Sequence, residues 1–397
     1  MAHFYLCWEL GGGLGHAGRL KSIALPLRAR GHRVSFVLRD LVLTRRLLQG
    51  LDIPSFQAPV WLHRTVGLPP EQASLAEILL GCGYLDADAL AGLCEGWRAL
   101  LRQGQPDLVI ADYAPTAILA ARSLRVPSAA IGPGFSMPPQ GMPLPPLRSW
   151  ETQQPGRLQA MESRLLASAN SVLGAYGAAP LAVGSELLLG DHPQLCTWPE
   201  LDHYGREGGG PWLGPNLPPP GTGVPAWPAG EGRRVFAYLR QGIPESADVL
   251  QALLRHGCRV LCYMPEVAAG APAPVDSPRV RFAPGPVALP QALAECELVV
   301  SHAGEALVAQ ALLASRPLLM LPHSAESFLM ARRVAQLGAG INAMAQPRPR
   351  DWEGMVTGVL AQPACGEAAA AFARRYAGFD PQRQAEELAD RFEAMLR

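Results

Sequence analysis

The stretch from Leu298 to Leu337 constrains the fold more than any other part of the sequence. Its pattern predicts a short apolar strand, a His-Ala-Gly turn, a helix from near Glu305, a second strand, and a second helix that ends at Gly338. Such strand-helix-strand-helix units build parallel α/β sheets, in which ligands bind beyond the carboxyl ends of the strands. We therefore expect His302, Gly304 and Glu326 on a binding edge, where the helix start at Glu305 suits a phosphate.

The amino-terminal part of the chain repeats the same alternation. An apolar strand from Phe4 to Leu10 runs into the turn GGGLGHAGR, and a helix and a second strand at Arg33 to Leu38 follow. Pro26 is expected to kink this helix or to end it early. Further along, a buried strand leads to Asp112, and residues 132–146 are too rich in proline and glycine for regular structure. This order predicts a Rossmann-like domain.

Proline and glycine dominate residues 211–232, which have the composition of a semi-rigid linker. We therefore predict an amino-terminal domain over 1–210 and a second domain over 233–380. Residues 381–397 form an amphipathic helix through Ala385, Leu388, Phe392 and Leu396, which can return to the first domain. The predicted fold class is α/β, with two Rossmann-like domains that face each other across a cleft.

Composition narrows the partners and the compartment. The 34 Lys and Arg residues equal the 34 Asp and Glu residues, so no broad basic face for nucleic acid is expected. The eight cysteines are dispersed without a Cys-x-x-Cys pair, as in a reduced, cytoplasmic protein. No signal peptide or membrane span is expected. The segment from Arg39 to Gln49 can form an amphipathic helix that lies on an anionic membrane surface, and this alternative to an ordinary surface helix stays open.

Several of these segments together resemble a known family. The carboxyl-terminal half contains VVSHAGEAL, QALLASRPLLMLP, ESFLMARRV and LGAG, and the amino-terminal half contains GLGHAGR, RGHRVSFV and DLVIAD. In this order and spacing they resemble the GT-B glycosyltransferases that transfer a sugar from a nucleotide-sugar to small molecules. The resemblance spans nearly the whole chain.

The resemblance implies a catalytic pair. His16 matches the histidine that deprotonates the acceptor hydroxyl, and Asp112 matches the aspartate that orients it and stabilises the imidazolium. A hydroxyl is a weak nucleophile and needs a base whose pKa lies near neutrality, which suits histidine. The implied reaction inverts the anomeric centre and uses a UDP- or dTDP-linked sugar as co-substrate, with no other cofactor. No cluster with metal-ligand spacing is present, so no metal is expected.

The resemblance also places a donor site in the second half. It assigns His302, Gly304, Gln310 and Glu326 to the donor. To these we add Gly15 in the first glycine-rich turn and, as a hypothesis of our own, Arg240. The chain departs from the family pattern at several positions: Ala303, Ala306 and Leu307 stand where Gly, Gly or Asn, and Ser or Thr are usual. Arg240-Gln241 replaces a Gly-Ser or Gly-Thr pair. Our hypothesis is that the Arg240 guanidinium compensates by binding a phosphate bidentately.

The acceptor is expected to be small and apolar or aromatic. Phe135, Met137 and Trp61 lie in the loop 132–146 and in the variable stretch 60–83, where they are predicted to contact it. The oligomeric state stays open.

Three other functions remain alternatives. A nucleotide-sugar hydrolase would use His16 to activate water, and a catalytically weak binding protein could share the same fold. The pattern Gly13-x-Gly15-x-x-Gly18 with Asp40 also fits the dinucleotide fingerprint of an NAD- or FAD-dependent oxidoreductase. Against that alternative, His16 is bulky where a pyrophosphate must approach, and the fingerprint leaves residues 301–340 unexplained.

Overall fold

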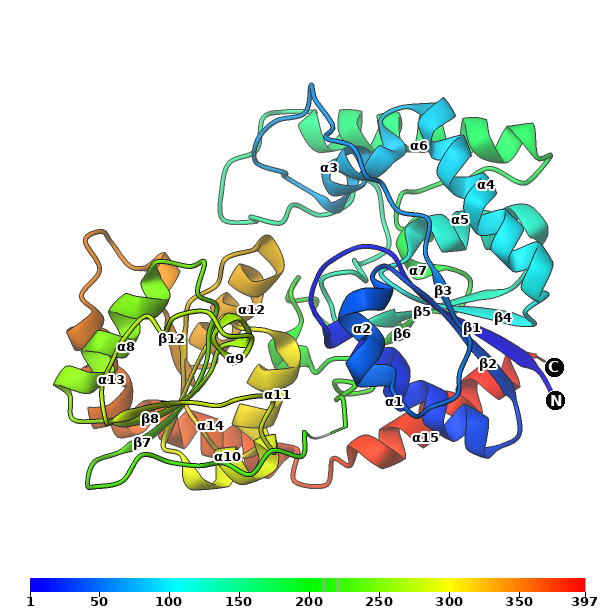
Figure 1. The fold of residues 1–397 in the computed structure, drawn as a ribbon. Helices are drawn as coiled ribbons and strands as arrows, with labels where there is room; N and C mark the ends of the chain where they lie inside the picture. Colours follow the sequence, from blue (N-terminus) through cyan, green and yellow to red (C-terminus); the bar gives the residue numbers. More distant parts are fainter. Residues whose placement is uncertain (209, 211, 220, 397) are drawn as a thin grey trace. The chain divides into compact units, whose positions relative to one another are not determined.

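The computed structural model describes residues 1–208, 210, 212–219 and 221–396. Positions 209, 211, 220 and 397, which belong to the predicted first domain, linker and last helix, lie outside the described residues. The chain divides into two compact units. Unit 1 is Met1–Pro218 together with Asp380–Arg397, and unit 2 is Pro219–Phe379 (Figure 1).

Unit 1 is built around a six-stranded parallel sheet with the order β3-β2-β1-β4-β5-β6. This is the Rossmann strand order, in which the direction of winding reverses between β1 and β4. Its elements are β1 His3–Trp8, α1 Gly15–Ala29, β2 Arg33–Leu38, α2 Leu41–Leu48, β3 Ser55–Gln57, α3 Leu75–Leu79, the π-helix η1 Leu80–Tyr84, α4 Ala87–Gly104, β4 Leu108–Asp112, α5 Pro115–Leu124, β5 Ser128–Gly132, α6 Arg157–Ala175, α7 Glu186–Leu189, β6 Gln194–Leu195, the 3-10 helix η2 Pro199–Leu201 and α15 Pro381–Ala394.

Both faces of this sheet are covered, which explains why its central strands are mostly apolar. All six residues of β1 are buried. Phe4, Leu6 and Trp8 pack into a core with side chains of α1 and α15, while α4, α5 and α6 form the layer on the other side (Figure 1). Pro26 does not end α1 early: the helix continues to Ala29, because a proline in the last turn removes a single backbone hydrogen bond close to the helix end.

Unit 2 has the same topology. Its six parallel strands follow the order β12-β11-β10-β7-β8-β9, with the reversal between β10 and β7. Its elements are β7 Arg234–Tyr238, α8 Glu245–Arg255, β8 Arg259–Tyr263, α9 Pro265–Ala268, β9 Val280–Phe282, α10 Leu289–Glu295, β10 Leu298–Ser301, α11 Glu305–Leu313, β11 Leu318–Met320, α12 Ala325–Gln336, β12 Gly340–Asn342, the 3-10 helix η3 Ala343–Ala345, α13 Trp352–Ala361 and α14 Pro363–Arg375. The predicted α/β class with two Rossmann-like domains is confirmed.

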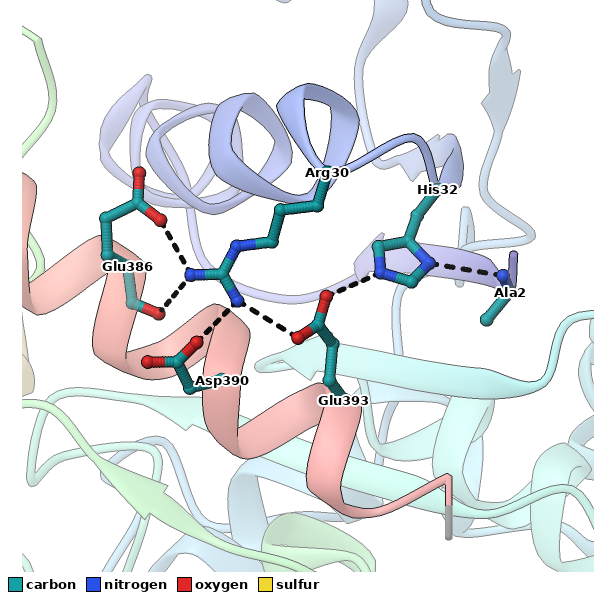
Figure 2. Close-up of polar contacts among 6 residues, drawn as sticks. All are labelled: Ala2, Arg30, His32, Glu386, Asp390 and Glu393. Atoms are coloured by element: carbon teal, nitrogen blue, oxygen red, sulfur yellow. Dashed lines mark hydrogen bonds and ion pairs between the residues drawn. The ribbon is translucent and has the colours of Figure 1, made fainter.

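Helix α15 returns to unit 1, as the sequence allowed, although it follows unit 2 in the chain. Its residues Leu388, Ala389 and Phe392 join the core beneath β1 and α1. Polar contacts add to this packing (Figure 2): Arg30, at the end of α1, makes ion pairs of 2.7, 2.6 and 3.2 Å with three carboxylates of α15, those of Glu386, Asp390 and Glu393.

A histidine connects this ionic cluster to the chain just before β1. His32 Nε2 lies 2.6 Å from the Glu393 carboxylate, and the backbone N–H of Ala2 donates to His32 Nδ1 at 3.1 Å. The hydrogen bond from His32 lowers the pKa of Glu393, and Arg30 acts in the same direction. The carboxylate therefore stays ionised in the folded state, and α15 is bonded both to the end of α1 and to the start of β1.

None of the helices in the described part of the chain combines the length and the apolar character that crossing a bilayer requires.

The Arg30 cluster predicts a measurable contribution to stability. Arg30→Ala removes one cation from among three carboxylates, and because the group is partly exposed we expect a loss of about 1 kcal/mol and a fall in Tm of about 2–4 °C. The matched control is Arg383→Ala, which breaks a single pair with Glu387 on the same helix, where the arginine side chain is 78% exposed. Thermal unfolding at low and high salt measures both. Equal losses in the two variants would contradict the prediction.

Candidate functional site

Two turns at the winding reversal of unit 1 bring the predicted catalytic pair together. Strands β1 and β4 are neighbours, with Trp8 opposite Asp112 at their carboxyl ends. The chain leaves β1 through the glycine-rich turn and enters α1 at Gly15, so His16 and Arg19 occupy the first two turns of that helix. Residues three apart share a helix face, and both side chains reach the carboxylate of Asp112.

The contacts of Asp112 are short and buried. His16 Nδ1 lies 2.9 Å from Asp112 Oδ1, and Arg19 Nη1 donates to both carboxylate oxygens at 2.9 Å. Asp112 is 0% exposed and His16 is 7% exposed. Burial alone would raise the pKa of Asp112, but Arg19 and His16 outweigh it and hold the pKa below its ordinary value. Asp112 is therefore an ionised acceptor. His16 must donate from Nδ1, so in the neutral imidazole the lone pair is on Nε2.

Arg19 is a site residue that the sequence interpretation missed. The spacing His16-x-x-Arg19 at the start of a helix was the available signal, because residues three apart face the same way. Without this arginine a fully buried carboxylate would carry a large desolvation cost. It also shares the negative charge of Asp112 with His16, so the imidazole is oriented by a carboxylate that is already partly neutralised.

Aromatic rings and a glycine confine the His16 imidazole. The ring stacks on Trp8, with centroids 5.3 Å apart and planes 14° apart, and Tyr113 lies 6.4 Å away. On the side of Nε2 the turn passes so close that a Cβ atom on Gly11 would lie 2.5 Å from this nitrogen. Gly11 also has φ +78°, in the left-handed region. The turn thus fixes both the position of the imidazole and the approach to its free nitrogen.

The predicted acceptor residues lie in two different surroundings. Phe135 and Met137 are 5% and 2% exposed. Phe135 packs edge-on against Tyr113, with centroids 6.2 Å apart, so it lies behind the ring that borders His16. Trp61 is half-buried and contacts His63 and Thr65 in its own segment. The structure therefore brings Phe135 into the aromatic group around His16, while Trp61 packs within the stretch 60–83, where its ring lies beside Gly83.

The loop that carries Phe135 and Met137 is held by specific hydrogen bonds. The hydroxyl of Tyr204 donates to the Phe135 carbonyl at 3.1 Å, and Arg206 donates to the Met137 carbonyl at 2.7 Å. Arg206 is itself paired with the buried Asp202 at 2.9 Å. Beyond Gly132, which ends β5, the loop has no helix or strand, as its composition indicates, yet its first part is packed into unit 1.

In unit 2, His302 connects the ends of three strands. It follows β10, its Nδ1 donates to the carbonyl of Leu321 beyond β11 at 2.7 Å, and its Nε2 accepts the backbone N–H of Arg240 beyond β7 at 2.9 Å. Burial lowers the pKa of His302 to about 4; the hydrogen bond to Leu321 opposes this shift, and His323 and Arg240 add to it. His302 is therefore neutral at physiological pH, and both ring nitrogens are engaged within unit 2.

Arg240 has an acidic partner that the sequence interpretation did not foresee. Its Nη1 lies 3.0 Å from Oε1 of Glu266 in the short helix α9, and the backbone N–H of Gln241 points to the other oxygen at 3.4 Å. About two-fifths of the Arg240 side chain and about a third of the Glu266 side chain are exposed. A carboxylate thus takes one of the guanidinium donors that the hypothesis reserves for a phosphate.

Helix α11 starts where the sequence predicts, but several residues around its start differ from the family pattern. The helix begins at Glu305, as the sequence predicts, and Gly304 is its N-cap residue. Ala303 has φ +59°, a conformation that favours glycine and costs an alanine of order 1–2 kcal/mol. Gln310 donates to the carbonyl of Ala306 in its own helix at 3.0 Å. Glu326 lies in the first turn of α12, which Ser324 and Ser327 cap reciprocally.

Within the described ranges, no group of three or more His, Cys, Asp or Glu side chains is arranged to hold a metal ion.

Comparison with known proteins identifies the fold. No protein-family model and no curated protein matches the sequence. Solved structures do match over the whole chain. A structure described as the glycotransferase of kitacinnamycin is 19% identical, with a TM-score of 0.71, and the match covers 100% of this chain and 99% of that chain.

Two further structures show the same likeness. The glycosyltransferase SnogD from Streptomyces nogalater is 18% identical with a TM-score of 0.63, and the match covers 99% of each chain. The glycosyltransferase VinC, solved in complex with dTDP, is 18% identical with a TM-score of 0.64, and the match covers 96% of this chain and 100% of that chain. The expected GT-B fold is confirmed.

The close approach of the glycine-rich turn to His16 yields a prediction with an internal control. Gly11→Ala and Gly13→Ala both place an alanine at positive φ, +78° and +80°, but a Cβ has no neighbour within 4 Å at Gly13. Each should lose about 1–2 kcal/mol from the backbone conformation, and Gly11→Ala should lose at least ~1 kcal/mol more because the imidazole must move. Denaturant unfolding of the two variants measures the difference, and equal stability would show that the turn does not confine His16.

Proposed function

We propose that this chain, which has the GT-B fold, is an inverting glycosyltransferase that moves a sugar from a UDP- or dTDP-linked donor to a hydroxyl of a small acceptor. The observation that carries the proposal is the buried arrangement of His16 and Asp112, in which Nδ1 is bonded to an ionised carboxylate, so that Nε2 is the nitrogen left to accept a proton. A histidine so oriented is a general base for a hydroxyl.

The reaction follows from that geometry. His16 Nε2 removes the proton of the acceptor hydroxyl while the oxygen attacks the anomeric carbon, and the nucleoside diphosphate leaves from the opposite face with the bonding electrons. The attack inverts the configuration of that carbon. Asp112 stabilises the imidazolium that forms, and Arg19 keeps Asp112 ionised and fixed. Since Gly11 borders Nε2, the acceptor hydroxyl must approach along the glycine-rich turn.

On the acceptor side, the aromatic surroundings of His16 favour an apolar or aromatic molecule. Trp8 and Tyr113 flank the imidazole, and Phe135 packs edge-on against Tyr113. In this proposal Phe135 and Met137 act mainly as the packed wall of the site because so little of either is exposed. Trp61 contributes, if the acceptor extends to it, through its half-exposed ring.

On the donor side, the proposal rests on backbone N–H groups and on Arg240. The start of α11, where Gly304 is the N-cap residue, provides backbone N–H groups and a positive dipole end, and Gly15 starts α1 in the same way. The neutral His302 fixes the backbone of Arg240. Glu326 and Gln310 remain candidates for sugar and ribose hydroxyls. That VinC was solved with dTDP bound supports a nucleoside diphosphate as the leaving group.

The first test separates donor binding from catalysis. Thermal unfolding with UDP, dTDP, ADP, GDP and NAD should show a rise in Tm with UDP or dTDP, because a ligand that binds only the folded state stabilises it. His16→Ala should keep that rise but lose transfer activity by a factor of about 10²–10⁴. Sugar release without an acceptor would favour a hydrolase, binding without turnover would favour a binding protein, and a response to NAD alone would contradict the proposal.

The pairing of Arg240 with Glu266 predicts a competition at the donor site. An exposed pair of this kind is worth at most about 1 kcal/mol, so a diphosphate with more charge can displace the carboxylate. Glu266→Gln should therefore raise the affinity for dTDP or UDP up to about fivefold, and Arg240→Ala should lower it by about tenfold. Calorimetric titration measures both.

The matched control for this competition is Glu297→Gln. Glu297 pairs with Arg233 at 3.5 Å just before β10, at the opposite end of the same sheet, and its side chain is 49% exposed. Its removal should leave the affinity unchanged. An unchanged affinity in Arg240→Ala would rule out the compensating role of the guanidinium.

A further inference from the structure

Glu9 is a fully buried carboxylate beside the candidate catalytic pair, and the reaction described above does not use it. It follows β1 directly and is 1% exposed. Its Oε2 accepts the backbone N–H of Thr116 at 2.8 Å, and its Oε1 accepts the Thr116 hydroxyl at 2.6 Å. Thr116 is the second residue of α5. A side chain from the end of one strand thus caps the helix that follows the neighbouring strand.

The segment between that cap and Asp112 is very short and strained. Asp112 ends β4 and Pro115 starts α5, so Tyr113 and Ala114 make the whole turn. Tyr113 has φ +50°. A bulky side chain in the left-handed region is unfavourable, and such a conformation persists only where the surroundings hold it.

Residues that extend β1 hold this turn at two points. The backbone N–H of Leu10 donates to the carbonyl of Tyr113 at 2.9 Å, and the Glu9 carboxylate holds Thr116 three residues further on. The hydrogen bond from Leu10 holds Tyr113 itself, and the hydrogen bonds of Glu9 hold the first turn of α5, which follows Tyr113. Together they leave Asp112 little freedom to turn away from His16 and Arg19.

We propose that Glu9 is a positioning residue: by capping α5 it holds the Tyr113 turn and so keeps the Asp112 carboxylate in hydrogen-bond contact with His16. This inference rests on the proposed role of His16 and Asp112 in transfer. Glu9 touches neither residue in that pair through a hydrogen bond of its own; it acts through Thr116 and the turn.

The surroundings of Glu9 show how it tolerates burial and how it can be replaced. Burial raises its pKa to about 7, against the opposing effect of the Thr116 hydrogen bonds and of Arg39. Tyr84 from the π-helix lies 2.9 Å from the Thr116 hydroxyl. A glutamine fits the same place, since its amide oxygen can accept the Thr116 N–H and its amide nitrogen can donate to the hydroxyl, which then donates to Tyr84. Alanine offers neither contact.

The test uses the Nδ1 proton of His16, which reports directly on the contact with Asp112. In the full-length protein labelled with ¹⁵N, a proton held between an imidazole and a carboxylate gives a downfield resonance. This resonance is assigned to His16 by its disappearance in the variant His16→Gln. We expect the resonance to persist in Glu9→Gln and to shift or broaden into exchange with water in Glu9→Ala. An unchanged resonance in Glu9→Ala overturns the proposal.

A control separates positioning from general destabilisation. Glu77 is another carboxylate of unit 1 with 0% exposure, and it accepts the Ala73 N–H at 2.8 Å and pairs with Arg157 at 2.7 Å. Glu77→Ala should lower Tm yet keep the His16 resonance. Loss of the His16 resonance in Glu77→Ala would overturn the proposal.

If Glu9→Ala does not fold, Thr116→Ala takes its place, since it removes one of the two bonds while keeping the backbone cap. The His16 resonance should then shift, and an unchanged resonance again counts against Glu9. Because this readout needs no turnover, a wild-type protein that shows the resonance but transfers no sugar would refute the proposed function and leave the positioning role intact.

Discussion

The candidate site depends on one interaction: the pairing of the buried, negatively charged Asp112 with Arg19 and His16. An isolated carboxylate with no exposure would be very costly, and here Arg19 and His16 make it stable by supplying donors from the first turns of α1. The requirement runs in both directions. The charge fixes the tautomer of His16, and the two donors fix the place of the carboxylate, so the helix start, the strand end and the turn between β4 and α5 form one mutually dependent unit.

The two Rossmann-like units use the same edge of the sheet for different purposes. At the winding reversal of unit 1 a charged and aromatic cluster orients one imidazole. At the equivalent reversal of unit 2 a neutral imidazole, that of His302, joins three strand ends, and the charge lies on Arg240 and Glu266. The same residue type therefore has different partners in each unit: the Nδ1 atom of His16 meets an ionised carboxylate, whereas both ring nitrogens of His302 bond to backbone groups.

Much of this was predictable from the sequence, for identifiable reasons. The alternation of apolar strands with helices predicts both sheets, and the start of α11 at Glu305 follows from the His-Ala-Gly turn. The proximity of His16 and Asp112 follows from their places at the carboxyl ends of neighbouring strands. Arg19 was missed although its three-residue spacing from His16 offered a signal. Glu9 was missed because its contact with Thr116 at the start of α5 leaves no local sequence pattern, and Glu266 was missed because α9 is a single short turn inside a proline-rich loop. The roles of the donor residues stay predictions.

The return of α15 to unit 1 has a consequence for the order in which the chain can fold during synthesis. Unit 2 is an insertion between Pro218 and Asp380, so the ribosome makes all of it before the helix that completes the core of unit 1. Until Phe392 is buried, the faces of α1 and β1 that it covers lack their last layer. Unit 2, in contrast, is continuous in sequence and can complete its own sheet earlier. Domains usually fold from the amino terminus onward; here the first domain to begin is the last to be finished.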